Sequence, residues 1–121
     1  MTGHFLLVGA GGAVGAMLRH GVGIASLRLF GPNFPWGTLI VNVVGGLLMG
    51  LLVGMFAARG GSEPLRLLLG VGVLGGFTTF SAFSLDVVTL AGRGAMLTAA
   101  GYTLLSVVAS IAALYLGKAL V

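Results

Sequence analysis

Four long apolar segments, separated by short breaks, constrain the fold of this chain more than any other feature. Each is at least as long as the roughly 20 apolar residues that cross the hydrocarbon core of a bilayer. The breaks are short, so consecutive helices should be antiparallel neighbours. The sequence therefore predicts an all-α integral membrane protein with one domain, residues 1–121, and four transmembrane helices over residues 4–28, 35–58, 64–89 and 94–119.

Charged side chains are too few to cover a water-exposed surface. They make up 7% of the 121 residues, against roughly 25% in soluble domains. The two acids, Glu63 and Asp86, do not form the carboxylate pair of a soluble enzyme. The basic residues are scattered singly, unlike the clusters of nucleic-acid-binding proteins, and the absence of Cys excludes disulfides and Cys-based zinc sites. We expect a membrane protein that is not an enzyme and binds no nucleic acid.

The positive charges show no preference for one side of the membrane. If the four helices alternate in direction, three basic residues fall on each side: Arg19, Arg28 and Arg93 against Arg59, Arg66 and Lys118. Orientation normally follows an excess of Lys and Arg in the cytoplasmic loops, and here there is none. We therefore expect dual topology, with two copies pairing antiparallel as a homodimer. The alternative is that a weak bias still gives one orientation.

Glycine makes up 23 of the residues and recurs at a spacing of four within three of the segments. Residues four apart share one face of a helix, and small residues at this spacing let helix backbones approach closely in lipid. We expect packing seams along these faces: Gly11 with Gly15, Gly46 with Gly50 and Gly54, and Gly72 with Gly76.

The third apolar segment contains a stretch that is unsuited to a helix. Residues 75–84 read Gly-Gly-Phe-Thr-Thr-Phe-Ser-Ala-Phe-Ser, and adjacent glycines and β-branched threonines are poor helix formers. A break inside the membrane is tolerated only where the freed backbone groups are buried in protein or line a cavity. Freed carbonyls there can coordinate a monovalent cation, as in transporters with discontinuous helices. We expect a broken third helix, the alternative being a kink absorbed by packing.

Polar and aromatic side chains line up on single helix faces. Phe80 and Phe83 share a face, and so do Ser81 and Ser84. The edge of an aromatic ring is positive, so ring edges turned into a narrow path would favour a small anion. The alternative is that the aromatic pair belongs to the packed core.

The fourth segment carries a hydroxyl stripe of residues four apart: Thr98, Tyr102, Ser106 and Ser110. The second segment carries Asn42, whose amide can donate two hydrogen bonds. Polar groups at such positions either bind helices together or line a path. Donors without carboxylates indicate an anion path rather than a cation path.

Four charged or titratable residues lie in or near the apolar segments: Arg19 is the one charge inside a segment, and the other three lie near segment ends. Arg19 either extends to the membrane surface or attracts anions into a vestibule. Asp86 is expected to pair with a nearby Arg or to face water. The two histidines, His4 and His20, are expected at the interface.

Three motifs occur in order along the whole chain: Gly11-Gly12-x-x-Gly15-Ala16-x-x-Arg19, Trp36-Gly37-Thr38-Leu39-x-x-Asn42-x-x-Gly45 and Gly75-Gly76-Phe77-Thr78-Thr79-Phe80-Ser81-x-Phe83. Together they resemble the Fluc (CrcB) fluoride-channel family, and the third is the most specific. The chain departs from the family pattern at His20, where an aromatic residue is common, and at Ala82, where threonine is frequent.

The resemblance implies a multi-pass protein of the cell inner (plasma) membrane that forms an antiparallel, dual-topology homodimer. It implies two fluoride pores that give passive, electrodiffusive export of cytoplasmic fluoride, hence fluoride resistance, with one structural sodium ion at the dimer centre. The backbone carbonyls of Gly75 and Thr78 from both subunits would hold the sodium ion, and Arg19 would lie at a vestibule. The candidate pore residues are Asn42, Thr79, Phe80, Ser81, Phe83, Ser84, Tyr102, Ser106 and Ser110.

Two other functions remain open. Small dual-topology multidrug exporters are of similar length, but they need a carboxylate in the first span, and residues 1–30 contain none. A membrane assembly subunit would explain the glycine seams, but it would explain neither the hydroxyl stripe nor the broken helix.

Overall fold

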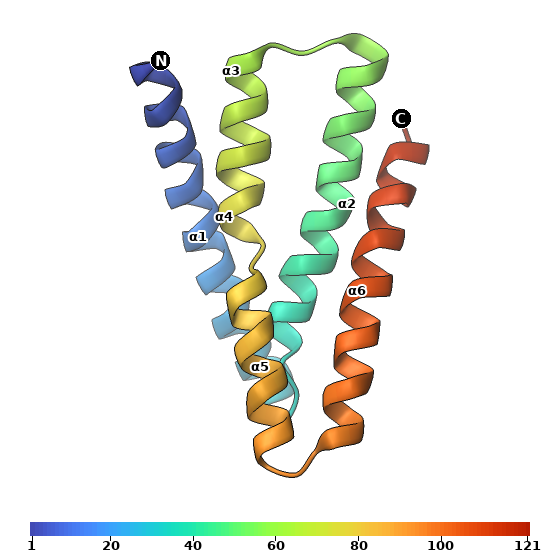
Figure 1. The fold of residues 1–121 in the computed structure, drawn as a ribbon. Coiled ribbons are helices and arrows are strands. Elements are labelled where there is room, and N and C mark those ends of the chain that lie inside the picture. The colour runs from blue at the N-terminus through green and yellow to red at the C-terminus, as the bar shows by residue number, and fades with distance from the viewer.

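The computed structural model describes all 121 residues, and it contains the four long apolar helical rods that the sequence predicts (Figure 1). By length and composition, each rod can cross a membrane. The first, second and fourth rods are single helices, α1 (Thr2–Phe30), α2 (Trp36–Arg59) and α6 (Met96–Ala119). The third rod is divided into α3 (Glu63–Leu65), η1 (Arg66–Leu74), α4 (Gly75–Phe77) and α5 (Phe80–Gly92).

Glycine ends the first two rods. Gly31 and Gly60 follow α1 and α2 with φ angles of 80° and 76°, and their N–H groups donate to Leu27 O and Phe56 O. Only glycine adopts such angles without steric cost, so both helices end where the sequence places it. Ser62 begins the third rod, since its side chain accepts a hydrogen bond from the N–H of Leu65.

The third rod is broken within the range that the sequence indicates. Thr78 and Thr79 are extended, with ψ angles of 159° and 124°. The preceding nine residues, Arg66–Leu74, form a π-helix that the sequence did not indicate. In Figure 1 the break lies near the middle of the rod, between α4 and α5.

Two glycine-lined seams organise the packing, and they join the rods in pairs. α1 packs against η1 and α4, while α2 packs against α6. A Cβ atom on Gly72 would lie 2.9 Å from Gly11 Cα, and one on Gly46 would lie 2.6 Å from Ser110 O. Such approaches leave no room for a side chain. The most extensive contacts therefore join the first rod to the third and the second to the fourth, while consecutive rods are also in contact, as the short breaks predicted.

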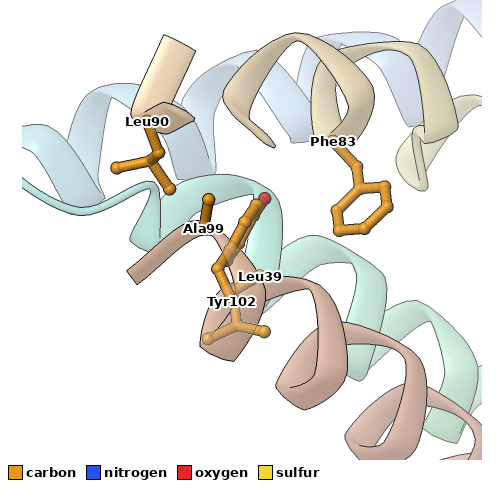
Figure 2. Close-up of a cluster of buried hydrophobic side chains, with 5 residues drawn as sticks. All are labelled: Leu39, Phe83, Leu90, Ala99 and Tyr102. Carbon is orange, nitrogen blue, oxygen red and sulfur yellow. The ribbon is translucent and has the colours of Figure 1, made fainter. Parts of the chain in front are cut away.

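The interior is small, as expected for a protein surrounded by lipid. Only 17 of the 121 residues are buried, which leaves most large apolar side chains available to a bilayer. One buried cluster joins α2, α5 and α6 near the end that holds the α5–α6 connection (Figures 1 and 2). It comprises Leu39, Phe83, Leu90, Ala99 and Tyr102.

Candidate functional site

A groove of about 450 Å³ lies between α2, the broken third rod and α6. No Asp, Glu, Lys, Arg or His lines it. The groove brings together seven of the residues that the sequence singled out: Asn42, Thr78, Thr79, Phe80, Phe83, Ser106 and Ser110. Side chains from three separate rods thus converge on one uncharged, mostly apolar space that a few polar groups line.

The side chain of Asn42, on α2, binds the backbone at the break in the third rod. Its Nδ2 donates to Thr79 O at 3.0 Å, and its Oδ1 accepts from the N–H of Thr79 at 2.8 Å. The amide therefore satisfies both backbone groups of one extended residue. Its second N–H remains for another acceptor.

The side chain of Arg19, on α1, also binds the third rod beside the break. Its Nε–H donates to Gly76 O at 3.0 Å, and the side chain is partly buried. It also lines a second cavity, of about 320 Å³, together with Thr79. From sequence, Arg19 is expected either at the membrane surface or at a vestibule, and neither expectation included this contact with the broken rod.

The break separates several carbonyls from their helical partners, among them those of Gly75 and Thr78. In a continuous α-helix the N–H of Thr79 would donate to Gly75 O, and that of Ala82 to Thr78 O. Instead, Asn42 Oδ1 takes the first N–H, and Thr79 Oγ1 takes the second at 3.1 Å. The Gly75 and Thr78 carbonyls are the two that the family resemblance implies as sodium ligands.

The serine hydroxyls of the stripe on α6 are buried without a partner. Neither Ser106 Oγ nor Ser110 Oγ forms a hydrogen bond within the chain. The adjacent Thr103 behaves differently, because its hydroxyl donates to Ala99 O at 2.8 Å. Thr98, the first member of the stripe, is exposed. The buried unpaired donors are therefore confined to the part of the stripe that lines the groove.

The two phenylalanines of the break lie against each other, but they differ in exposure. Their ring centroids are 5.6 Å apart, with an interplanar angle of 50°. Phe83 is 9% exposed and also packs on Tyr102, at 5.4 Å. Phe80 is 78% exposed. The pair thus runs from the buried cluster to the open side of the groove.

Three predicted pore residues do not line the groove. Tyr102 is buried beside it, and its hydroxyl donates to Asp86 Oδ2 at 3.0 Å. Ser81 Oγ lies 3.4 Å from Thr79 Oγ1, and Ser84 Oγ donates to Phe80 O at 2.9 Å. Ser81 and Ser84 thus engage the start of α5.

Asp86 has a partner that the sequence did not indicate. Its hydrogen-bond donor is Tyr102, and no arginine pairs with it. Asp86 lines a third cavity, of about 310 Å³, together with Arg93, whose Nη2 donates to Asn33 O at 2.6 Å. Asp86 and Arg93 therefore share a cavity without forming an ion pair.

Comparison with known proteins finds one family and several similar proteins that match nearly the whole chain. The family model described as "CrcB-like protein, Camphor Resistance (CrcB)" matches residues 6–118. The protein named "Fluoride-specific ion channel FluC" from Agrobacterium fabrum is 58% identical over 115 residues, which cover 94% of this chain and 92% of that protein. The proteins of the same name from Mesorhizobium japonicum and Caulobacter sp. are 54% and 56% identical over 114 residues, covering 94% and 93% of this chain and 92% and 89% of theirs.

Proposed function

This chain belongs to the CrcB-like family, and we propose that it forms a fluoride-selective channel for passive, electrodiffusive export of cytoplasmic fluoride. Its relatives at 53–58% identity are named as fluoride-specific channels, so the chain is a channel and not an enzyme. Four helices able to span a bilayer make it a multi-pass membrane protein. Export from the cytoplasm requires that this membrane be the plasma (inner) membrane.

The observation that carries the proposal is the pair of buried, unpartnered hydroxyls in the groove. Ser106 Oγ and Ser110 Oγ have no acceptor within the chain, and burying a polar group without a partner costs free energy. An anion that moves along the groove would accept hydrogen bonds from both. The second N–H of Asn42 would add a third donor in the same space.

The electrostatics of the groove also favour a small anion. No carboxylate lines it, so nothing in the lining repels an anion or holds a metal cation by charge. The rings of Phe80 and Phe83 add positively polarised edges without a fixed charge. Several weak donors along the path would replace the water around fluoride. The ion would then bind well enough to enter the path and weakly enough to leave it.

We further propose a structural sodium ion that the backbone of the break would hold. The fit rests on the Gly75 and Thr78 carbonyls, whose helical N–H partners are taken by Asn42 and Thr79. Carbonyl oxygens of unwound helices are suitable ligands for sodium. The same two carbonyls from a second copy would complete the site.

An antiparallel homodimer would complete the groove as well. Phe80 lines the groove and is 78% exposed in the single chain, so the groove is open at this residue. A second copy placed there would convert the open groove into an enclosed path. With two equivalent grooves, such a dimer would have two pores.

Fluoride efflux from proteoliposomes tests the proposed function directly. Purified protein would be reconstituted with internal potassium fluoride, and valinomycin would carry the compensating potassium. We expect fast fluoride efflux driven by the membrane potential, with no chloride efflux from matched vesicles. Absence of fluoride efflux from a well-folded dimer would reject the proposal and favour a small multidrug-type exporter or an assembly subunit.

A further inference from the structure

Two side chains from distant parts of the chain replace the helical hydrogen bonds that are lost at the break. Arg19, 57 residues before Gly76, donates to the carbonyl of that glycine. Asn42, 37 residues before Thr79, binds both backbone groups of that threonine. In a continuous α-helix, Gly76 O would accept from the N–H of Phe80, and the N–H of Thr79 would donate to Gly75 O. Each substitute comes from a different helix, α1 or α2.

We propose that Arg19 is a positioning residue for the break and that it acts through its Nε–H donor rather than through its charge. The one hydrogen bond that Arg19 makes to the protein runs from Nε, not from the terminal nitrogens. Nε is the donor nearest the backbone and the least able to move away. It fixes the direction of the Gly76 carbonyl, which lies in sequence between the carbonyls of Gly75 and Thr78.

The positive charge of the guanidinium does not help the break to bind a cation. A positive charge close to backbone carbonyls opposes binding of a cation by the neighbouring carbonyls. The hydrogen bond, by contrast, holds the Gly76 carbonyl towards α1 and so fixes the backbone that lies between those carbonyls. As far as ion flow is concerned, the inference rests on the proposed function. The hydrogen-bond role can be tested without it.

Two substitutions separate the donor from the charge. Arg19→Gln places an amide nitrogen, with its N–H donors, at the same number of bonds from Cα as Arg Nε, and it removes the charge. Arg19→Lys keeps the charge but places a methylene group where Nε donates. Arg28→Gln, an exposed position on the same helix, is the matched control for loss of one positive charge.

The first readout is amide hydrogen exchange in peptides that cover residues 74–84, measured on purified protein in nanodiscs. We expect Arg19→Gln and Arg28→Gln to match the wild type. Arg19→Lys should speed exchange of the Thr79 and Ala82 amides by about tenfold, because loss of a hydrogen bond from a charged group changes local opening to that degree. Fluoride efflux should stay close to the wild-type rate in Arg19→Gln and Arg28→Gln and should be slowest in Arg19→Lys.

Each result decides the question. Wild-type exchange in Arg19→Lys, or equal disturbance in Arg19→Gln and Arg19→Lys, would overturn the positioning role. Fast efflux in Arg19→Lys together with slow efflux in Arg19→Gln would instead assign Arg19 an anion-attracting charge. If only Arg19→Lys fails to assemble, the donor role is supported; if both variants fail, it is rejected. If the wild type conducts no fluoride, the proposed function fails, and the exchange comparison still decides the role of Arg19.

Discussion

The hydroxyl of Tyr102 donates a hydrogen bond to Asp86 Oδ2 at 3.0 Å, which joins α6 to α5. Tyr102 is 1% exposed and lies in the buried cluster of Figure 2, whereas Asp86 is half-buried. A half-buried carboxylate in a membrane protein needs a donor, and here the donor is neutral. The pair therefore joins α5, the part of the third rod that follows the break, to the fourth rod.

Removing this hydroxyl should destabilise the protein. We expect Tyr102→Phe to lower the free energy of unfolding by about 1.5–3 kcal/mol, the range for a hydrogen bond to a charged group. The matched control is Tyr115→Phe on the same helix, where the side chain is 69% exposed. Denaturant unfolding in detergent measures both. Equal effects of the two substitutions would contradict a specific role for the bond between Tyr102 and Asp86.

The unpaired hydroxyls of the groove should matter for conduction more than for stability. Ser106→Ala and Ser110→Ala remove donors that have no acceptor within the chain, so we expect little change in unfolding. Fluoride efflux should fall by about tenfold for each, because one hydrogen bond to the ion is lost. Thr103→Val is the control, since that hydroxyl is bound to Ala99 O and lies outside the groove. An efflux loss in Thr103→Val as large as in the serine variants would refute the assignment of the path.

The seam between the first and third rods should not tolerate even one methyl group. A Cβ atom on Gly15 would contact Val73 O and lie 2.7 Å from the backbone nitrogen of Phe77, beside the break. We expect Gly15→Ala to destabilise the fold by about 1–3 kcal/mol, as overpacking does. Gly21→Ala on the same helix meets no atom within 4 Å and should be neutral or slightly stabilising. The unfolding midpoints in detergent compare the two, and similar midpoints would argue against the seam.

The sequence predicts the elements of this fold better than their pairing. Segment length and hydropathy identify the four rods, and weak helix formers predict a break within residues 75–84, which the structure places at Thr78 and Thr79. The spacing of glycines correctly identifies which helix faces are packed. It does not say which faces meet, because any two small-residue faces are compatible. The pairing of the first rod with the third therefore emerges only from the three-dimensional structure.

The same limit applies to the candidate site. Residues four apart on one helix can be recognised in sequence, and Ser106 and Ser110 do line one groove. The contacts of Arg19 and Asn42 with the break join residues 57 and 37 positions apart. A side chain that binds a distant backbone group has no local signature. The isolated polarity of Arg19 and Asn42 in apolar segments was the one signal that they have a partner.

The position of Arg19 also changes the charge count on which orientation depends. Because Arg19 is bound to the broken rod, it no longer counts as a loop charge. Arg28 and Arg93 then stand at one end of the molecule, against Arg59, Arg66 and Lys118 at the end that holds both termini (Figure 1). A difference of one charge is a weak determinant of orientation, so we still expect both orientations.

Dual topology can be measured by cysteine labelling, because the chain has no Cys of its own. Gly3→Cys and Gly92→Cys place single thiols at exposed positions near opposite ends of the molecule, and neither meets an atom within 4 Å. In intact cells, a maleimide that cannot cross the membrane should label about half of each variant, since the two ends face outwards equally often when the charge bias is weak. Labelling after permeabilisation gives the total for each variant. Complete labelling of one variant and none of the other would establish a single orientation and exclude the antiparallel dimer.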